Sequence, residues 1–232
     1  MVEEITLQGL ALGLLPVAFV ILIMWRWSAG APTAMYATAR MLIQLLLIGY
    51  VLVFIFEAEY ASVVGIVLTT MLIIASWIAI RPVAKARSQA FRDALIAISV
   101  GGVLVLAIVT QVVIAVEPWF NPRYVVPLAG MVFAGAMNAV SLAAERFHAE
   151  RVREVSYREA RRIALSAALI PITNSLFAVG LVALPGMMTG QILSGISPLV
   201  AAKYQIVVMS MLFGVSGLSA AVFLGLQTQK GK

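Results

Sequence analysis

Residues 184–205 read LPGMMTGQILSGISPLVAAKYQ, and this stretch decides what fold the rest of the chain must build. Two prolines and three glycines interrupt it, yet it is too apolar for an ordinary water-exposed loop. Non-helical backbone survives near a bilayer only where protein buries it or where it lines a wet cavity, because lipid cannot hydrogen-bond free amide groups. The stretch therefore predicts a broken or re-entrant segment held by neighbouring helices. The alternative is an extracytoplasmic loop that contains a short helix.

The composition identifies the class of protein. Of the 232 residues, 62% are hydrophobic and 11% are charged, whereas soluble domains carry roughly 25% charged residues. We therefore expect an all-α polytopic membrane helix bundle that forms a single transmembrane domain over residues 1–232. Cysteine is absent, which excludes disulfides and thiolate metal sites.

The chain has room for about seven helices if each span needs ~20 residues. With the N-terminus outside and the C-terminus inside, all 16 lysines and arginines except Arg123 and Lys203 fall on the inner side. This distribution satisfies the positive-inside rule and requires an odd number of spans. The approximate expected spans are residues 5–25, 36–56, 61–80, 94–116, 125–142, 163–184 and 206–226.

Several polar side chains are expected at membrane depth or at its edge. Arg40 and Gln44 lie one helical turn apart on one face of the second span. An ionisable residue inside a span is a functional candidate, although Arg40 is close enough to the inner interface to snorkel. Each polar side chain of this kind either lines a transport pathway or gate, or forms hydrogen bonds that hold neighbouring helices together. The candidates for the pathway or gate are Arg40, Gln44, Asn138, Asn174, Gln191 and Tyr204.

Proline and glycine mark the expected hinges. Pro171 lies inside the sixth expected span, where its missing N–H allows a kink. Gly186, Gly190 and Gly195 would give the broken segment its freedom to move. Small residues four positions apart, such as Gly130 with Ala134 and Asn138, or Gly217 with Ala221 and Gly225, predict faces where helices pack closely.

No dedicated metal cage is visible, so the metal ligands remain unknown. The thioethers of Met187 and Met188 would suit copper(I), but methionine at a packed site is more often filler. None of the expected spans contains Asp or Glu, and the only histidine, His148, lies in a charged segment. An ion would have to pass over amides, hydroxyls and carbonyls, or travel as a complex.

The charged segment 143–162 mixes acids and bases at helical spacing, with Glu154 and Arg158 as one i,i+4 pair. It is a solvated helix or a docking helix for a soluble partner. No G-x-x-x-x-G-K-S/T pattern occurs, so this chain is expected to bind no cofactor, and if transport is driven by ATP the ATPase is another chain. No nucleophile, base and orienting group are assembled, which argues against an enzyme. The expected docking residues are Glu150, Arg153, Glu154, Tyr157 and Arg158.

The stretch Leu184–Pro198 and its continuation Ala202–Ile206 resemble the signature of the Fet-type iron-export ABC permeases, a family related to plant aluminium-tolerance permeases. The resemblance extends over nearly the whole chain. Other matching runs are Arg40-x-x-x-Gln44-Leu45, Gly49–Leu52, Pro127–Met131, Met137-Asn138, Ala168–Pro171 and Val179–Val182. Two departures stand out, since Gly135 replaces an asparagine of the relatives and the loop before the sixth span is shorter, with Glu154–Ala160 in its place.

The resemblance implies a permease subunit that works as a homodimer with a separate ATP-binding cassette subunit and exports iron or another metal. Export of an anionic organic solute, such as the nucleotide sugars linked to plant relatives, is the first alternative, with Arg40 facing the charge. A membrane scaffold without transport is the second. The expected setting is the bacterial plasma membrane, which the chain crosses several times, with the lipid bilayer as a partner and no nucleic acid.

Overall fold

The computed structural model describes residues 6–83 and 87–227, and within them the chain is helical with two compact units, 1–57 and 58–232. Each unit is an all-α arrangement, as expected. The prediction that the whole chain acts as one transmembrane permease domain remains a prediction.

In the described part of the first unit, residues 6–57, the chain forms three helices. α1 (Leu7–Gly13) begins where the Thr6 hydroxyl accepts a hydrogen bond from the Gly9 N–H at 3.1 Å. α2 (Leu15–Arg26) follows after one residue, because the proline in its first turn has no N–H to continue the ladder. α3 (Ala31–Phe56) carries apolar side chains on all sides. Such helices suit a hydrocarbon environment rather than water.

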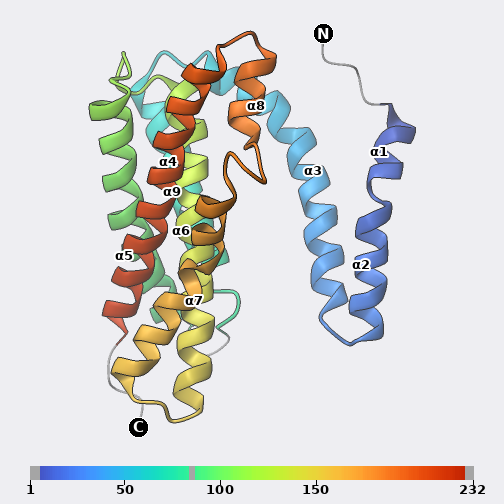
Figure 1. Cartoon of the computed structure of the whole chain (residues 1–232), viewed down its shortest axis with the longest axis vertical. Helices are drawn as coiled ribbons and strands as arrows, with labels where there is room; N and C mark the ends of the chain where they lie inside the picture. The colour runs from blue at the N-terminus through green and yellow to red at the C-terminus, as the bar shows by residue number, and fades with distance from the viewer. Residues whose placement is uncertain (1–5, 84–86, 228–232) are drawn as a thin grey trace. The chain divides into compact units, whose positions relative to one another are not determined.

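The second unit is built around one long central helix. This central helix, α6 (Pro122–Val152), contacts α4 (Ala61–Ala79), α5 (Arg87–Ala107), α7 (Tyr157–Ala178) and α9 (Pro198–Leu226), which surround it in the bundle (Figure 1). The second unit also contains the π-helix η1 (Ile108–Val113), which continues α5, and the short helix α8 (Gly186–Leu193) between α7 and α9.

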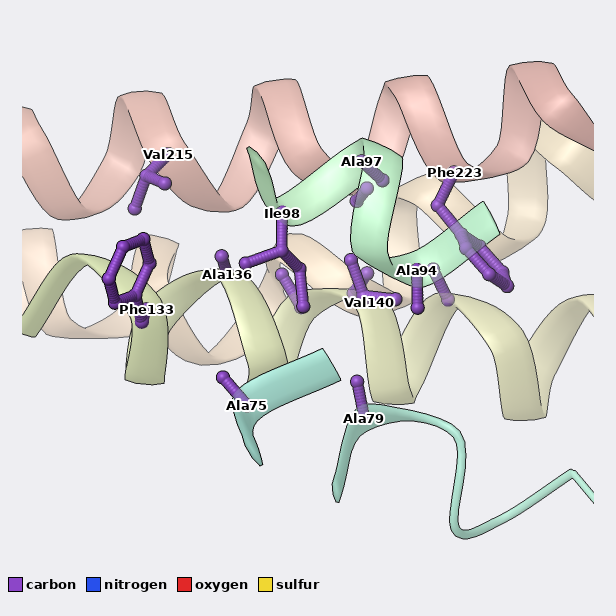
Figure 2. Close-up of a cluster of buried hydrophobic side chains, with 14 of the residues drawn as sticks. Ala75, Ala79, Ala94, Ala97, Ile98, Phe133, Ala136, Val140, Val215 and Phe223 are labelled. Atoms are coloured by element: carbon purple, nitrogen blue, oxygen red, sulfur yellow. The ribbon is translucent and has the colours of Figure 1, made fainter. Parts of the chain in front are cut away.

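Small side chains dominate the core of the second unit. Figure 2 shows Ala75 and Ala79 of α4 facing Ala136 and Val140 of α6, with Ile98 of α5 beside them. Alanine at these contacts lets the helix backbones approach closely, which drives helix association where lipid removes the hydrophobic driving force.

The close glycine contacts are not where the spacing predicted them. A Cβ on Gly217 or Gly225 of α9 would meet nothing within 4 Å, so the expected close-packed face on α9 is wrong within this chain. The expected face on α6 is also incorrect, since Ala134 and Asn138 are exposed. Close approach occurs instead at Gly101 of α5, where a Cβ would lie 2.3 Å from the Ser219 hydroxyl of α9.

Six helical segments in the described part of the chain are long and apolar enough to cross a membrane. The sixth expected span, 163–184, differs in its boundaries, because α7 begins at Tyr157 in the charged segment and ends at Ala178. The chain still passes from one end of the second unit to the other through α7, residues 179–185 and α8 (Figure 1). The helix α5 also starts earlier than expected, so that Asp93 lies inside a candidate span.

The broken segment predicted at 184–205 is confirmed. After α7 the chain turns at Gly180, where φ is +83°, and the N–H of Gly180 donates to the Ala183 carbonyl at 2.9 Å. The short helix α8 follows Pro185 and packs against α9. A second turn at Gly195, with φ at +90°, leads into α9 at Pro198.

Candidate functional site

The turn between α6 and α7 forms a projecting end of the second unit. α6 has 31 residues and is therefore about 46 Å long at 1.5 Å per residue, whereas the hydrocarbon core of a bilayer is about 30 Å thick. Figure 1 places this turn at the same end as the start of α5 and the end of α9. The basic residues at the start of α5 and around the α6–α7 turn, which the sequence assigned to one side of the membrane, thus lie at one end of the second unit.

The predicted single helix over 143–162 is wrong, because the helix stops at Val152 and a new one begins at Tyr157. Glu154 adopts φ of +62°, which ends the first helix. Ser156 caps the second by accepting a hydrogen bond from the Glu159 N–H at 3.3 Å. The Ser156-x-x-Glu159 spacing is a helix-start signal that the helical periodicity had concealed.

Ion pairs hold this turn. The Glu150 carboxylate is buried and lies 2.6 Å from the Arg146 guanidinium and 3.9 Å from that of Arg153. The Arg151 guanidinium donates to the Val155 carbonyl at 2.8 Å. Glu150 is therefore tied to its own helix and does not present a free charge to a partner.

The other four predicted docking residues lie at or beside the turn. Arg153, Glu154 and Arg158 are exposed, so a partner surface could reach their charges. Tyr157 is half-buried, and its hydroxyl donates to the backbone carbonyls of Leu224, at 3.4 Å, and Gln227 at the end of α9. The assignment of these residues to docking remains a prediction.

A polar link that the sequence reasoning missed joins three helices beside this turn. The Gln227 amide donates to the Asp93 carboxylate of α5 at 3.3 Å, while Tyr157 of α7 bonds the Gln227 carbonyl. Asp93 is 5% exposed. These hydrogen bonds tie the start of α7 to the end of α9 and to the second turn of α5. No local sequence signal points to this link, because its members are far apart in the chain.

The predicted pathway residues divide into three groups. Arg40 and Gln44 are exposed on α3 of the first unit. Asn138 on α6 and Asn174 on α7 are exposed on the second unit, where they do not enter its core. Gln191 on α8 and Tyr204 on α9 are partly buried.

Two buried amide groups lie on α8 and α9, which pack against each other, and the assignment of a pathway there remains a prediction. The Oε1 atoms of Gln191 and Gln205 are both buried and have no hydrogen-bond partner among the described residues. A buried acceptor without a partner costs about 1–3 kcal/mol. Met187 packs against the core, in keeping with its expected role as filler.

The four predicted hinge residues lie in different surroundings. α7 continues through Pro171 without ending, and the Ser175 hydroxyl donates to the Pro171 carbonyl at 3.0 Å. Gly186 and Gly190 are part of α8 with open space around them, and Gly195 lies in the turn that follows. The chain breaks at 179–185 and 194–197, so the hinge assignment for Pro171 has no break to support it and stays a prediction.

Among residues 6–83 and 87–227, no group of three or more His, Cys, Asp or Glu side chains is placed to hold a metal ion. Metal ligands for this chain therefore remain unassigned.

The chain is similar in sequence to several known membrane proteins. The probable iron export permease protein FetB of Escherichia coli is 34% identical over 236 residues, which cover 95% of this chain and 90% of FetB. The UPF0014 membrane protein slr1647 of Synechocystis is 33% identical, covering 91% of this chain and 87% of its own length. The UPF0014 membrane protein STAR2 of rice is 34% identical, covering 80% and 69%. No solved structure matches the chain.

These relatives agree with the expected multi-pass protein of the bacterial inner membrane, and the permease among them is named as a transport protein rather than an enzyme. The model of the uncharacterised protein family UPF0014 matches residues 7–230. The chain belongs to the family UPF0014.

Proposed function

We propose that this chain is the membrane-spanning permease subunit of an ABC-type transporter that exports iron or another metal ion, powered by a separate ATP-binding subunit. The observation that carries the proposal is the 34% identity to a protein named as a probable iron export permease, sustained over 95% of this chain. A match of that length includes the broken segment as well as the spans around it.

The α6–α7 turn is the proposed contact for the ATP-binding subunit. Arg153, Glu154 and Arg158 are exposed there at the end of a helix longer than the bilayer. Glu150 supports the turn from inside through its ion pair with Arg146. A push on this turn would reach α9 through the Tyr157 hydroxyl, so closure of the ATP-binding subunits would be transmitted to the spans.

The proposed pathway passes the contact of α8 with α9. The buried amide oxygens of Gln191 and Gln205 have no hydrogen-bond partner among the described residues and would offer a passing divalent cation hard, uncharged ligands. Arg40, Gln44, Asn138, Asn174 and Tyr204 remain candidates for the gate. The assembled transporter would contain two copies of this chain, as the family resemblance implies.

The test is ATP-driven transport in proteoliposomes that contain this chain and a candidate ATP-binding subunit that copurifies with it. Iron(II) should accumulate in the compartment opposite the ATP-binding subunit only with ATP, and a nucleotide sugar should not. Uptake of the sugar in place of iron would support the alternative substrate class, and ATP-independent leakage of both would refute the proposal.

A charge reversal tests the docking surface within the same assay. Arg153→Glu should lower ATP-dependent transport and copurification of the ATP-binding subunit. Arg123→Glu, at the start of α6 and at the opposite end of that helix, is the matched control. The cysteine-free chain also allows single cysteines at positions 153 and 123, which should react with impermeant reagents from opposite sides. Labelling of both from one side would contradict the topology.

A further inference from the structure

A groove of about 530 Å³ lies between α7 and α9 near the end of the bundle that carries the α6–α7 turn. Its lining combines three arginines with an apolar floor, and the residues are Tyr157, Arg158, Arg161, Arg162, Leu165, Ala221 and Leu224. None of the functional assignments above uses Arg161, Arg162 or the floor. The spacing of Arg158, Arg161 and Arg162 puts them on one face of α7.

The charge of the groove is strongly positive. Arg158 forms no ion pair with any described residue, and Arg161 stands over the Tyr157 ring, 5.5 Å from its centroid. Arg162 pairs with Glu159 through two hydrogen bonds of 3.0 and 2.6 Å. The hydrogen bond from Arg162 lowers the pKa of Glu159, and Glu159 raises the pKa of Arg162, so both remain charged at neutral pH.

Each guanidinium keeps donors for a ligand. A guanidinium has five N–H groups, and the pair with Glu159 occupies two of those on Arg162. Arginine is well suited to phosphate because its planar fork matches two phosphate oxygens at once. Three guanidinium groups facing one groove thus fit a phosphate group better than a neutral polar ligand.

The floor of the groove decides which kind of phosphate compound fits. Ala221 and Leu224 belong to the last turns of the apolar span Pro198–Leu226, and Leu165 lies one to two turns beyond the arginines on α7. The groove therefore runs from a charged end outside the span to an apolar wall alongside it. A phospholipid has this division, with its phosphate at the interface and its acyl chains beside the helices.

We propose that the groove between α7 and α9 binds an anionic phospholipid, with its phosphate against Arg158, Arg161 and Arg162 and an acyl chain along Leu165 and Ala221. Basic pockets between transmembrane helices on the cytoplasmic side are known to hold such headgroups. The bound lipid would brace α7 against α9 next to the link made by Tyr157. This inference does not depend on the substrate that the chain transports.

Native mass spectrometry of the full chain in detergent, with phosphatidylglycerol or phosphatidylcholine added, tests the site. Phosphatidylglycerol should be retained and phosphatidylcholine should not. Arg161→Gln with Arg162→Gln should weaken phosphatidylglycerol binding by about 25-fold, taking roughly fivefold for each arginine near a lipid surface. Arg92→Gln with Arg153→Gln removes the same charge from exposed positions at the same end and should leave binding within about twofold.

Two further variants change the site without removing an arginine. Glu159→Gln frees Arg162 from its ion pair and should strengthen phosphatidylglycerol binding by up to about fivefold. Ala221→Phe fills the apolar floor and should weaken binding while the charge stays the same. The thermal unfolding midpoint of each variant confirms that it is folded.

Three results would overturn the proposal. The first is equal loss of lipid from the groove pair and from the control pair. The second is displacement of the lipid by millimolar inorganic phosphate with no effect of Ala221→Phe, which would make the site one for soluble phosphate. The third is unchanged lipid binding in the groove pair together with lost copurification of the ATP-binding subunit, which would make the groove a protein docking surface.

Discussion

The contact between Gly101 of α5 and Ser219 of α9 allows a quantitative prediction. In a Gly101→Ala protein the new Cβ would lie 2.3 Å from the Ser219 hydroxyl oxygen, 3.0 Å from its backbone nitrogen and 3.3 Å from its Cα. Rotation of the hydroxyl relieves only the first of these, so the helices must separate. Overpacking of this kind costs about 1–3 kcal/mol, against a gain of about 1 kcal/mol from replacing glycine by alanine within a helix.

Gly217→Ala on α9 is the matched control, because a Cβ there meets nothing within 4 Å. The helix-propensity term is common to both variants, so the difference in their unfolding free energies isolates the clash and should be about 1–3 kcal/mol. Reversible unfolding by SDS titration, followed by the fluorescence of the 4 tryptophans, measures both.

Ser219→Ala in the Gly101→Ala background should recover part of the loss, since it removes the 2.3 Å contact and leaves the two backbone contacts. The Ser219 hydroxyl is buried with no partner among the described residues, so Ser219→Ala alone should be close to neutral. Equal stability of Gly101→Ala and Gly217→Ala would refute the inferred approach of α5 to α9.

Three further substitutions follow from the same structure. Glu150→Gln breaks the buried ion pair with Arg146 and should lower the unfolding free energy by about 1–3 kcal/mol; stability equal to that of the unsubstituted chain would show that the pair is not formed. Tyr157→Phe removes the hydroxyl that bonds the end of α9 and should cost about 1 kcal/mol, with faster hydrogen exchange confined to the last turn of α9 as the local readout. Gly195→Ala forces alanine to φ of +90° and should lower the unfolding free energy by about 1–2 kcal/mol. Gly190→Ala, at a helical position with open space around it, should be neutral or stabilising. If an SDS titration finds Gly190→Ala less stable than Gly195→Ala, the left-handed turn at Gly195 is excluded.

Residue chemistry alone was sufficient for the membrane class and for the broken segment. Runs of apolar residues must become helices in lipid, and the prolines and glycines between Leu184 and Pro198 cannot be accommodated in one continuous helix. The same reasoning gathered the basic segments on one side, and the fold brings those of the second unit to one end. The start of α7 also depends on local sequence alone, since Ser156-x-x-Glu159 caps that helix.

The contacts between helices depended on the tertiary structure. Small residues four apart on α9 (Gly217, Ala221 and Gly225) suggested a packing face, yet the close approach falls at Gly101, because the rotation of each helix about its axis is set by all its neighbours together. Gln227 joins Asp93 and Tyr157 across 134 and 70 positions of sequence.

The sequence by itself determined that the chain is a membrane helix bundle with a broken segment near its end, because hydrocarbon permits few backbone arrangements. Only the tertiary structure decided which polar groups meet. It separated Asn138 and Asn174 from the core, buried Glu150 beside Arg146, and opened the arginine-lined groove between α7 and α9. These outcomes depend on helix rotation and crossing, which follow from the packing of many small side chains at once and have no signature within any one segment.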